Sequence, residues 1–488
     1  MRRTLTSLIC LSLAACSGGG GSGSVTGGGS TGGITPTPTP SSTTAAGCTL
    51  RERQLWAAAQ LNEWYLFPET LPASLDPAPY STVSDYIDAL TATARSQGRD
   101  RYFTYLTSIA EENAYYNSGA TAGFGFRLYL NGNRLFSAET FEGTTALGAG
   151  IDRGTEILAI GTSTTNLRNV SDILATSGTA GLTDALGPNT SGTTRSLRVT
   201  DPAAGTRVVT IAKTDYSLDP VSTRYGAKII DDGGHRVGYV NLRTFISTAD
   251  TPLRNAFASF KAAGVTEVIV DVRYNGGGLV SIAELMGNLL GANRSTSDVF
   301  DSMTFRPSKS VENSTTYFSP QTQSIAPTKL AFIGTSSTAS ASELVAAGML
   351  PYLGANLALV GSNTYGKPVG QIAIDKTACD DRFRIIAFAL QNSAHQGAYF
   401  NGLASIVQAS CKAADDIAYP MGDAREASTR AALDFIEGKS CTAITASTGD
   451  PAAASARQAS TTAVSEAGRT PLTPARPSVP QRDVPGMF

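Results

Sequence analysis

Two side chains with nucleophile and base chemistry follow apolar runs in the second half of the chain. Ser340 lies in the Ser/Thr-rich stretch 335–343, between the apolar runs 330–333 and 344–350. The first run is typical of a buried strand and the second of a helix, so Ser340 would occupy a sharp strand-to-helix turn. Such a turn places the hydroxyl at the end of a sheet and directs the first free N–H groups of the helix toward a ligand. Taken alone, this stretch would favour a Ser/Thr-rich helix cap without catalytic function.

Two glycine-containing stretches supply the other parts of a hydrolase site. Residues 268–278 form a β-branched run that leads into three glycines, whose N–H groups can approach a ligand closely. Lys367 lies between glycines just after the apolar run 357–360. A Lys that is shielded from water loses proton affinity and can act as a general base. The two histidines, His235 and His395, have no comparable setting, so the pattern favours a Ser–Lys pair over a Ser–His–Asp triad.

In this order, the three stretches resemble the C-terminal processing peptidases, also called tail-specific proteases. Residues 271–278 match the family pattern Asp-Leu-Arg-x-Asn-x-Gly-Gly, and residues 340–343 read Ser-Ala-Ser-Glu. Residues 364–367 match Thr-Phe-Gly-Lys, and Gln371 is the glutamine that follows it. The resemblance extends more weakly from about Gln54 to Cys441, and it implies a multidomain α/β protein with three folded parts. These are an N-terminal helical domain, a PDZ-like β domain and an α/β protease core of the crotonase and ClpP type.

The resemblance also implies catalytic roles. Ser340 would attack the peptide carbonyl, and Lys367 would take its proton. The N–H groups of Gly277 and Ala341 would hold the oxyanion. Gln371 would orient the Lys, although four residues of extended chain would separate the two Cα atoms by about 13 Å.

The first serine of the motif is not the only possible nucleophile. The interval to Lys367 is about two residues longer than is usual in the family, and by spacing Ser342 would take that role. We follow the motif and expect Ser340, with Ser342 and Glu343 as helix-start residues. Arg273 and Asn275 are expected to order the glycine loop rather than to react.

Two separated stretches resemble a PDZ domain. Gly123, Phe124, Gly125 and Phe126 resemble its carboxylate-binding loop, and residues 150–160 resemble its Gly-Leu-x-x-Gly-Asp-x-Ile-Leu-x-Ile stretch. Residues 169–174 follow where the helix of the peptide groove would lie. A peptide would add as a strand to the sheet edge while loop N–H groups hold its carboxylate. A small β domain with a tight glycine turn is the alternative.

The beginning of the chain is typical of an exported lipoprotein. The chain begins with two arginines and a short apolar run, and these are followed by Leu-Ala-Ala-Cys, which ends at Cys16. Cys16 therefore resembles the lipidated Cys of a lipobox. An ordinary secretory signal is the alternative. Ser rather than Asp follows Cys16, which for a Gram-negative host favours the outer membrane. We therefore expect a lipid-anchored protein of the bacterial cell envelope, facing the periplasm or the cell surface.

Composition divides the rest of the chain and excludes some functions. The chain has 38 basic and 40 acidic residues without a basic block, so nucleic acid is not an expected partner.

Four aromatic residues are expected in the core of the helical domain, with peptide binding as the alternative: Trp56, Trp64, Tyr65 and Phe67. The expected parts are a signal (1–16), a disordered Gly/Ser/Thr/Pro tether (17–47), a helical domain (48–117), a PDZ-like domain (118–215), a protease domain (216–441) and a disordered tail (442–488).

Four further cysteines, Cys48, Cys379, Cys411 and Cys441, fit two disulfides in an exported chain. We favour Cys379–Cys411, within one excursion of the protease domain, and Cys48–Cys441, joining the two ends of the folded part. No pair has CxxC spacing, so zinc is not expected, and no other metal or cofactor is implied.

These observations predict an exported, lipid-anchored serine endopeptidase that acts near exposed C-terminal tails of proteins. Its partners would be protein substrates with unstructured tails and a membrane. A non-catalytic peptide- or ligand-binding protein on the same scaffold is the alternative; retinoid-binding relatives use this core without proteolysis.

Overall fold

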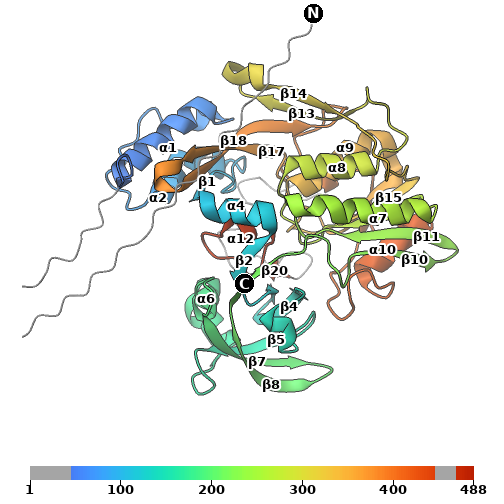
Figure 1. Ribbon diagram of the computed structural model, residues 1–488, viewed down its shortest axis with the longest axis horizontal. Coiled ribbons are helices and arrows are strands. Elements are labelled where there is room, and N and C mark those ends of the chain that lie inside the picture. The colour runs from blue at the N-terminus through green and yellow to red at the C-terminus, as the bar shows by residue number, and fades with distance from the viewer. Residues whose placement is uncertain (1–44, 446–468) are drawn as a thin grey trace, which may run out of the picture. The chain divides into compact units, whose positions relative to one another are not determined.

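The computed structural model describes residues 45–445 and 469–488 (Figure 1), and these residues belong to one packing unit. The predicted signal, the lipobox Cys16 and nearly all of the predicted tether lie outside the described residues. So does the middle of the predicted tail, residues 446–468.

A six-stranded sheet forms the centre of the protease region, in the strand order β10-β11-β12-β15-β16-β19. All neighbouring strands from β11 to β19 are parallel, and β10 is an antiparallel edge strand. Parallel neighbouring strands of this kind are joined by crossover connections, as in other α/β folds. The strands are Ala227–Asp232, His235–Asn241, Glu267–Asp271, Lys329–Gly334, Leu357–Gly361 and Ala409–Lys412.

Helices cover both faces of this sheet because alternate strand residues are apolar on each side. One core contains Val268, Val270 and residues of α7, α8 and α9, whereas Ile269 packs in another core with residues of α10. Because strands β11 to β19 are parallel, their carboxyl ends lie at one edge of the sheet, where ligands bind in α/β folds. The helices are Asp250–Ala262 (α7), Val280–Leu289 (α8), Ala341–Leu353 (α9) and Ala427–Ile436 (α10).

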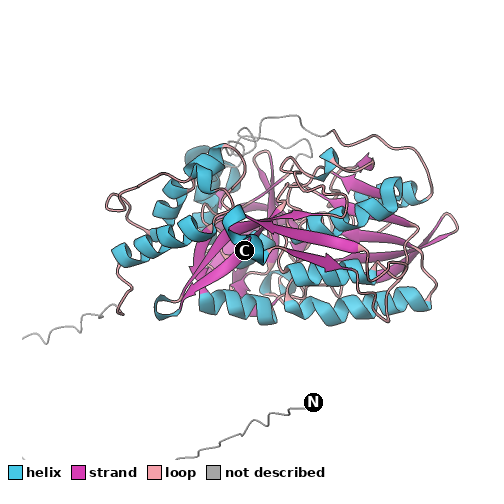
Figure 2. Cartoon of the chain, turned by 90° about the horizontal axis from the view of Figure 1, so that it is seen from above, coloured by secondary structure: helices cyan, strands magenta, loops and turns pink. Residues whose placement is uncertain are grey.

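A second, antiparallel sheet carries the lysine side of the region. Figure 2 shows the strands of the molecule in the middle of the view, with helices above and below them. The longest strand of the second sheet is β18 (Asp381–Gln391), which pairs with β17 (Val369–Lys376). The remaining strands are β1 (Tyr105–Ser108), β13 (Val299–Phe305) and β14 (Ser314–Tyr317).

The expected N-terminal helices pack on this second sheet. Tyr65 and Phe67 are buried, and Trp56 and Trp64 pack partly buried on the same core as Phe383. Burial supports the core interpretation of these aromatics over peptide binding. The helices are Leu50–Trp64 (α1), Val83–Leu90 (α2), Ala92–Ser96 (α3) and Ile109–Ser118 (α4).

A third sheet, of seven strands, contains both stretches that resemble a PDZ domain. β3 (Phe126–Asn131) begins in the predicted carboxylate loop, and α6 (Val170–Leu186) begins where the groove helix was expected. A small β-ribbon of β2 (Ala120–Gly123) and β9 (Thr214–Ser217) joins this part to the protease region. The other elements are Arg134–Thr140 (β4), Thr145–Gly148 (α5), Glu156–Gly161 (β5), Arg168–Asn169 (β6), Thr194–Asp201 (β7), Gly205–Ala212 (β8) and Thr470–Pro471 (β20).

The prediction of disorder over the whole tail 442–488 is wrong for residues 469–488. This C-terminal segment adds β20 to the edge of β3 and forms the short helix α12 (Val479–Asp483). Its apolar side chains, Val479, Val484, Met487 and Phe488, are buried in cores of the other domains. The segment cannot form a core of its own, so its local composition looked like that of a disordered chain.

All four predicted cysteines form disulfides, but the favoured pairing is wrong. The bonds are Cys48–Cys379 and Cys411–Cys441. Cys379 lies in the turn between β17 and β18, in the sheet on which α1 packs, so its neighbour is Cys48 just before α1. Cys411 lies in β19 of the central sheet, and its neighbour follows α10.

Among the helices in residues 45–445 and 469–488, none has the length and apolarity to cross a bilayer.

Candidate active site

Ser340 lies at a strained turn between β15 and α9. Its backbone has φ 57° and ψ −119°, a left-handed conformation that few non-glycine residues adopt. Such strain at a strand-to-helix turn is typical of an exposed nucleophile. A Cβ added to Gly277 would lie only 2.8 Å from the Ser340 Cβ, so the glycine loop lies directly against the Ser340 side chain.

Ser342 has a different environment from Ser340. Its side chain is fully buried, and its hydroxyl donates a hydrogen bond to the Asn275 carbonyl at 3.0 Å. This bond ties α9 to the glycine loop. Ser340 is half-buried and lies at the accessible end of the helix. The geometry therefore favours Ser340 as the reactive serine.

Lys367 and Gln371 are in direct contact, despite the long separation expected for an extended strand. The Lys367 Nζ donates to the Gln371 Oε1 at 3.1 Å. The pairing of β17 with β18 shifts by one residue between Gly370 and Gln371, and such a bulge redirects the following side chain. The Gln371 amide nitrogen in turn donates to the Phe103 carbonyl, which fixes its orientation.

The surroundings of Lys367 favour its neutral form. Burial lowers the pKa of Lys367 to about 8, and the Asp483 carboxylate acts in the opposite direction. The Phe103 ring centroid lies 4.9 Å from the Nζ and helps to exclude water. Burial also raises the pKa of Asp483, to about 6, against the attraction of Lys367.

Glu343 joins the serine turn to the lysine loop. One carboxylate oxygen accepts hydrogen bonds from the Ser340 N–H (3.0 Å) and the Lys367 N–H (2.7 Å). The other accepts from the Gly366 N–H (2.7 Å) and the Thr364 hydroxyl (2.6 Å). Burial raises the pKa of Glu343, and these four donors oppose that effect.

Glu343 was expected only as a helix-start residue, and its role as a link between the two loops was not predicted. The signal available in the sequence was its place in the Ser-Ala-Ser-Glu motif. Because both Ser340 and Lys367 bond to the same oxygen, the backbones of the two predicted catalytic residues are adjacent.

Buried polar groups order the glycine loop, as expected for Arg273 and Asn275. Asn275 donates to the Leu242 carbonyl at 2.9 Å, and its own carbonyl accepts from the Ala339 N–H at 3.1 Å. The Arg273 guanidinium is buried between Asp271 and Glu426, with closest N–O distances of 2.8 Å to each.

The predicted oxyanion pair is only partly available. The Gly277 N–H donates to the Asn275 Oδ1 at 2.9 Å, because the asparagine side chain turns back onto the loop. The Gly276 N–H donates to the Asp483 carbonyl at 2.7 Å. The Ala341 N–H is the first of α9, and helix-terminal N–H groups have no partner within the helix. The Gly277 assignment therefore requires a rearrangement of the loop.

The predicted carboxylate loop holds residue Phe488 of the same chain. The Gly125 and Phe126 N–H groups donate to the Phe488 carbonyl oxygen at 3.0 and 3.4 Å. The Phe488 N–H donates to the Phe126 carbonyl at 3.1 Å. A Cβ on Gly123 would lie 2.8 Å from the Phe488 carbonyl carbon, and Phe124 lies in the core that receives the Phe488 ring.

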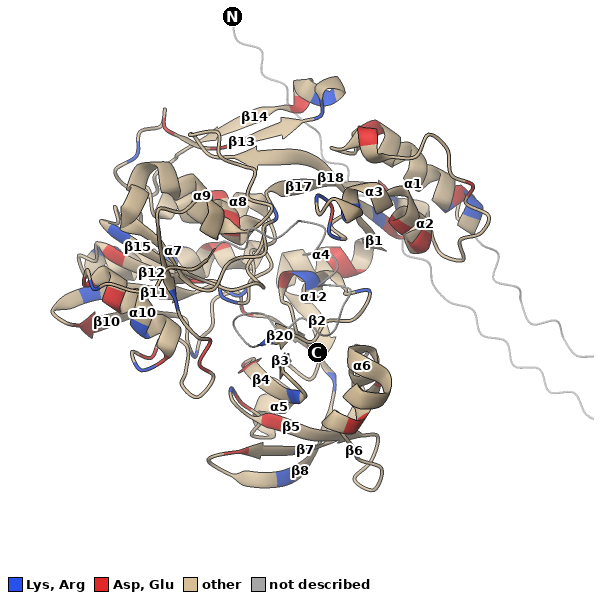
Figure 3. Cartoon of the chain, turned by 180° about the vertical axis from the view of Figure 1, so that it is seen from behind, with Lys and Arg blue, Asp and Glu red and all other residues tan. Residues whose placement is uncertain are grey.

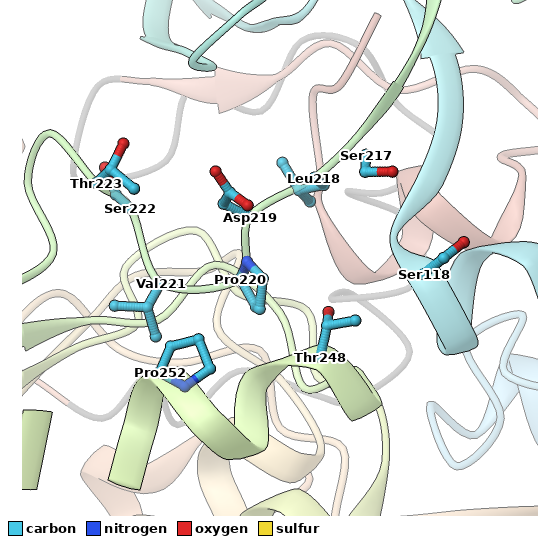
Figure 4. A pocket seen from close by; sticks show the side chains of 10 residues that line it. All are labelled: Ser118, Ser217, Leu218, Asp219, Pro220, Val221, Ser222, Thr223, Thr248 and Pro252. Atoms are coloured by element: carbon cyan, nitrogen blue, oxygen red, sulfur yellow. The ribbon is translucent and has the colours of Figure 1, made fainter. Parts of the chain in front are cut away.

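Other potential sites in the described residues do not compete with this one. His235 bonds to Glu267 at 2.7 Å, at the amino end of β11 and away from the strand ends that carry Ser340 and Lys367. No group of three or more His, Cys, Asp or Glu side chains within 45–445 and 469–488 could hold a metal ion. Figure 4 shows a cavity of about 320 Å³ that contains none of the predicted catalytic residues and is lined by Ser118, residues 217–223, Thr248 and Pro252.

Comparisons with known proteins agree with this geometry. The model of peptidase family S41 matches residues 236–387, which include both Ser340 and Lys367. A carboxyl-terminal-processing protease from Picosynechococcus sp. is 28% identical over 256 residues, which are 51% of this chain and 55% of that protein. The chain thus spans about half the length of this curated relative.

A solved structure from Bacteroides fragilis, assigned to the S41 proteases, has a similar fold. It is 20% identical, its TM-score is 0.60, and the match covers 78% of this chain and 97% of that one. The family model identifies residues 236–387 as a peptidase S41 domain, the curated relative supports the C-terminal processing peptidases within that family, and the solved structure shows a similar fold.

Proposed function

We propose that the chain is a serine endopeptidase that uses Ser340 and Lys367 to cleave protein substrates near exposed C-terminal tails. The observation that carries this proposal is the shared Glu343 oxygen, which accepts from both Ser340 and Lys367. It holds a strained serine turn beside a lysine whose pKa is lowered by burial. Gln371, in contact with the Lys367 amine, is the third member of the site.

The reaction would proceed through an acyl-enzyme. The Ser340 Oγ attacks the carbonyl carbon while the neutral Lys367 amine takes its proton. The N–H groups of Ala341 and the glycine loop stabilise the oxyanion. Lys367 then gives the proton to the leaving amine as the peptide bond breaks, and a water molecule hydrolyses the acyl-Ser340 ester by the same proton route.

Capture of substrate tails by a PDZ-like domain is part of the proposal. The loop at Gly125 and Phe126 already holds the Phe488 carbonyl oxygen through two N–H groups, and the Phe488 N–H donates to the Phe126 carbonyl. This is the bonding by which a strand adds to a sheet edge beside a carboxylate loop. The same occupied groove favours the alternative, a peptide-binding protein without catalysis.

A lipid anchor at Cys16, in the bacterial cell envelope, completes the proposal and rests on the lipobox-like sequence. Cys16→Ser should move the protein from the membrane fraction to the soluble fraction. Sedimentation with membranes that only detergent reverses would instead indicate another anchor.

The decisive experiment is incubation of the purified protein with casein. We expect cleavage by the wild type, none by Ser340→Ala, and substantial cleavage by the matched control Ser342→Ala. Loss of cleavage only in Ser342→Ala would overturn the choice of nucleophile. Peptide binding without cleavage by any form would leave the non-catalytic alternative as the better function.

A further inference from the structure

The C-terminal segment 469–488 connects the two sites described above. Phe488 occupies the Gly125 loop, and its ring is 2% exposed in the core between β3 and α6. Two residues earlier, the Gly486 carbonyl accepts from the Leu128 N–H at 2.7 Å. Residues 486–488 thus pair with β3 as an added strand, which is the binding mode of a captured peptide.

The same segment covers the glycine loop beside Ser340. The Asp483 carbonyl accepts from the Gly276 N–H, and a Cβ on Gly276 would overlap the Arg482 carbonyl oxygen. The Asp483 carboxylate acts on Lys367, since each shifts the titration of the other. Residues 482–483 therefore occupy space that a substrate peptide needs in order to reach the glycine loop.

Further contacts hold α12 between the N-terminal helices and the second sheet. Figure 3 shows α12 beside α4, which carries acidic residues. Arg482 stacks over the Tyr105 ring at 3.8 Å and donates to the Tyr102 carbonyl at 3.0 Å. Arg476 pairs with Asp85 and Asp88, with N–O distances of 2.5 and 2.9 Å.

The docking is incomplete in ways that favour release. The Asp483 Oδ2 and the Arg482 Nε are buried without a hydrogen-bond partner among the described residues. A buried polar group without a partner destabilises the docked state. A cavity of about 700 Å³ also lies along the segment, lined in part by Arg476, Gln481 and Phe488. In addition, the apolar residues of the segment fill sites on other domains rather than a core of their own.

From these contacts we propose that residues 479–488 are an intramolecular pseudo-ligand, which blocks access to Ser340 and is displaced by peptides that end in a large apolar residue. The inference rests on the proposed function. Phe488 sets the specificity, because its ring fills the apolar site and its backbone makes the strand contacts. Peptides that end in a charged residue lack this anchor and do not displace the segment.

The test uses the chain with a site-specific protease sequence inserted within residues 446–468, so that the segment is in place before the cut. Cleavage and removal of the segment by gel filtration should raise kcat/KM on a reporter peptide. The expected rise is about tenfold, which corresponds to an intact chain in which the segment is displaced from the site about one-tenth of the time. A synthetic 469–488 peptide should restore inhibition. The matched control peptide, with Phe488→Glu, should not.

The other outcomes separate this inference from the proposed function. Equal rates before and after removal of the segment would overturn the inference while leaving the peptidase function intact. Proteolysis by neither form would refute the proposed function and, with it, the inhibitory role. Anisotropy of a labelled 469–488 peptide on the stripped Ser340→Ala chain reports docking independently, and failure to bind would overturn the inference whatever the rates.

Discussion

The ionisation of Lys367 should control the rate of cleavage. Only the neutral amine can accept the Ser340 proton, so kcat/KM should rise with pH along one ionisation. The burial that lowers the pKa of Lys367 to about 8 sets its midpoint. Lys367→Arg should be inactive, because a guanidinium stays protonated at any workable pH.

The effect on the rate is large. With a pKa of about 8, about one Lys367 in ten is neutral at pH 7. At the ordinary lysine value only about one in 3,000 would be neutral, so burial raises the fraction of active base about 300-fold. Asp483 is the largest influence that opposes this effect, whereas Arg482 of the same segment acts together with burial to lower the pKa of Lys367.

The same titration predicts how stability depends on pH. Between pH 8 and the unfolded lysine value of about 10.4, the folded chain has released the Lys367 proton while the unfolded chain keeps it. The unfolded state then binds more protons, so the free energy of unfolding rises with pH in this window. At pH 7 the buried ammonium destabilises the fold, and Lys367→Met should be more stable by at most about 3 kcal/mol.

Two measurements check this reasoning. The first is a pH–rate profile of kcat/KM on one peptide, for the wild type and Lys367→Arg. The second is urea unfolding of Ser340→Ala with and without Lys367→Met, at pH 7 and pH 10. Full activity of the Arg variant would refute the Ser–Lys mechanism. Equal stability of the two unfolding variants at pH 7 would show that the lysine is not effectively buried.

Three further predictions concern the Glu343 link and the two disulfides. Glu343→Gln keeps the shape of the side chain but loses an acceptor for the backbone N–H groups of Ser340 and Lys367. Because a charged hydrogen bond contributes about 1.5–3 kcal/mol, kcat should fall about tenfold to hundredfold. An unchanged kcat would show that Ser340 and Lys367 do not need this link. Replacement of Cys48 and Cys379 by Ser opens a loop with a sequence separation of 331, and it should lower the free energy of unfolding by about 2–5 kcal/mol in denaturant melts. Peptide mapping under non-reducing conditions should recover the Cys48–Cys379 and Cys411–Cys441 pairs, and a Cys379–Cys411 peptide would contradict the structure.

Local sequence patterns predicted the central sheet and the residues at its edge. A strand that runs into glycines and a strand that runs into a helix each carry their signal within about ten residues. Parallel strands bring such ends together, so Ser340 and the 271–278 loop could be placed at one site. The Lys367–Gln371 contact could not be derived in this way, because it depends on a bulge that forms only when β17 pairs with β18.

Long-range pairings were the weak point of the prediction. The cysteine pairs depend on which sheet each cysteine belongs to, and the periodicity of a strand does not identify its sheet. Apolar residues from Phe383 to Leu390 are typical of a strand, but this pattern does not show that the strand lies in the antiparallel sheet with β17 rather than beside β16. Cys379 lies in the turn between the two strands of that sheet, on which α1 packs, and for this reason its partner is Cys48.

The C-terminal segment shows why a single sequence can hide an ordered region. Val479, Val484, Met487 and Phe488 have no neighbours of their own with which to form a core, so the segment has the composition of a disordered chain. Their order comes from apolar sites on other parts of the chain, beside β3 and α4. The segment adds β20 at the edge of β3 and contributes no strand to the central sheet that carries Ser340. The dependence of the segment on apolar sites elsewhere in the chain hid its order from prediction, and the same dependence suits it to act as a removable ligand.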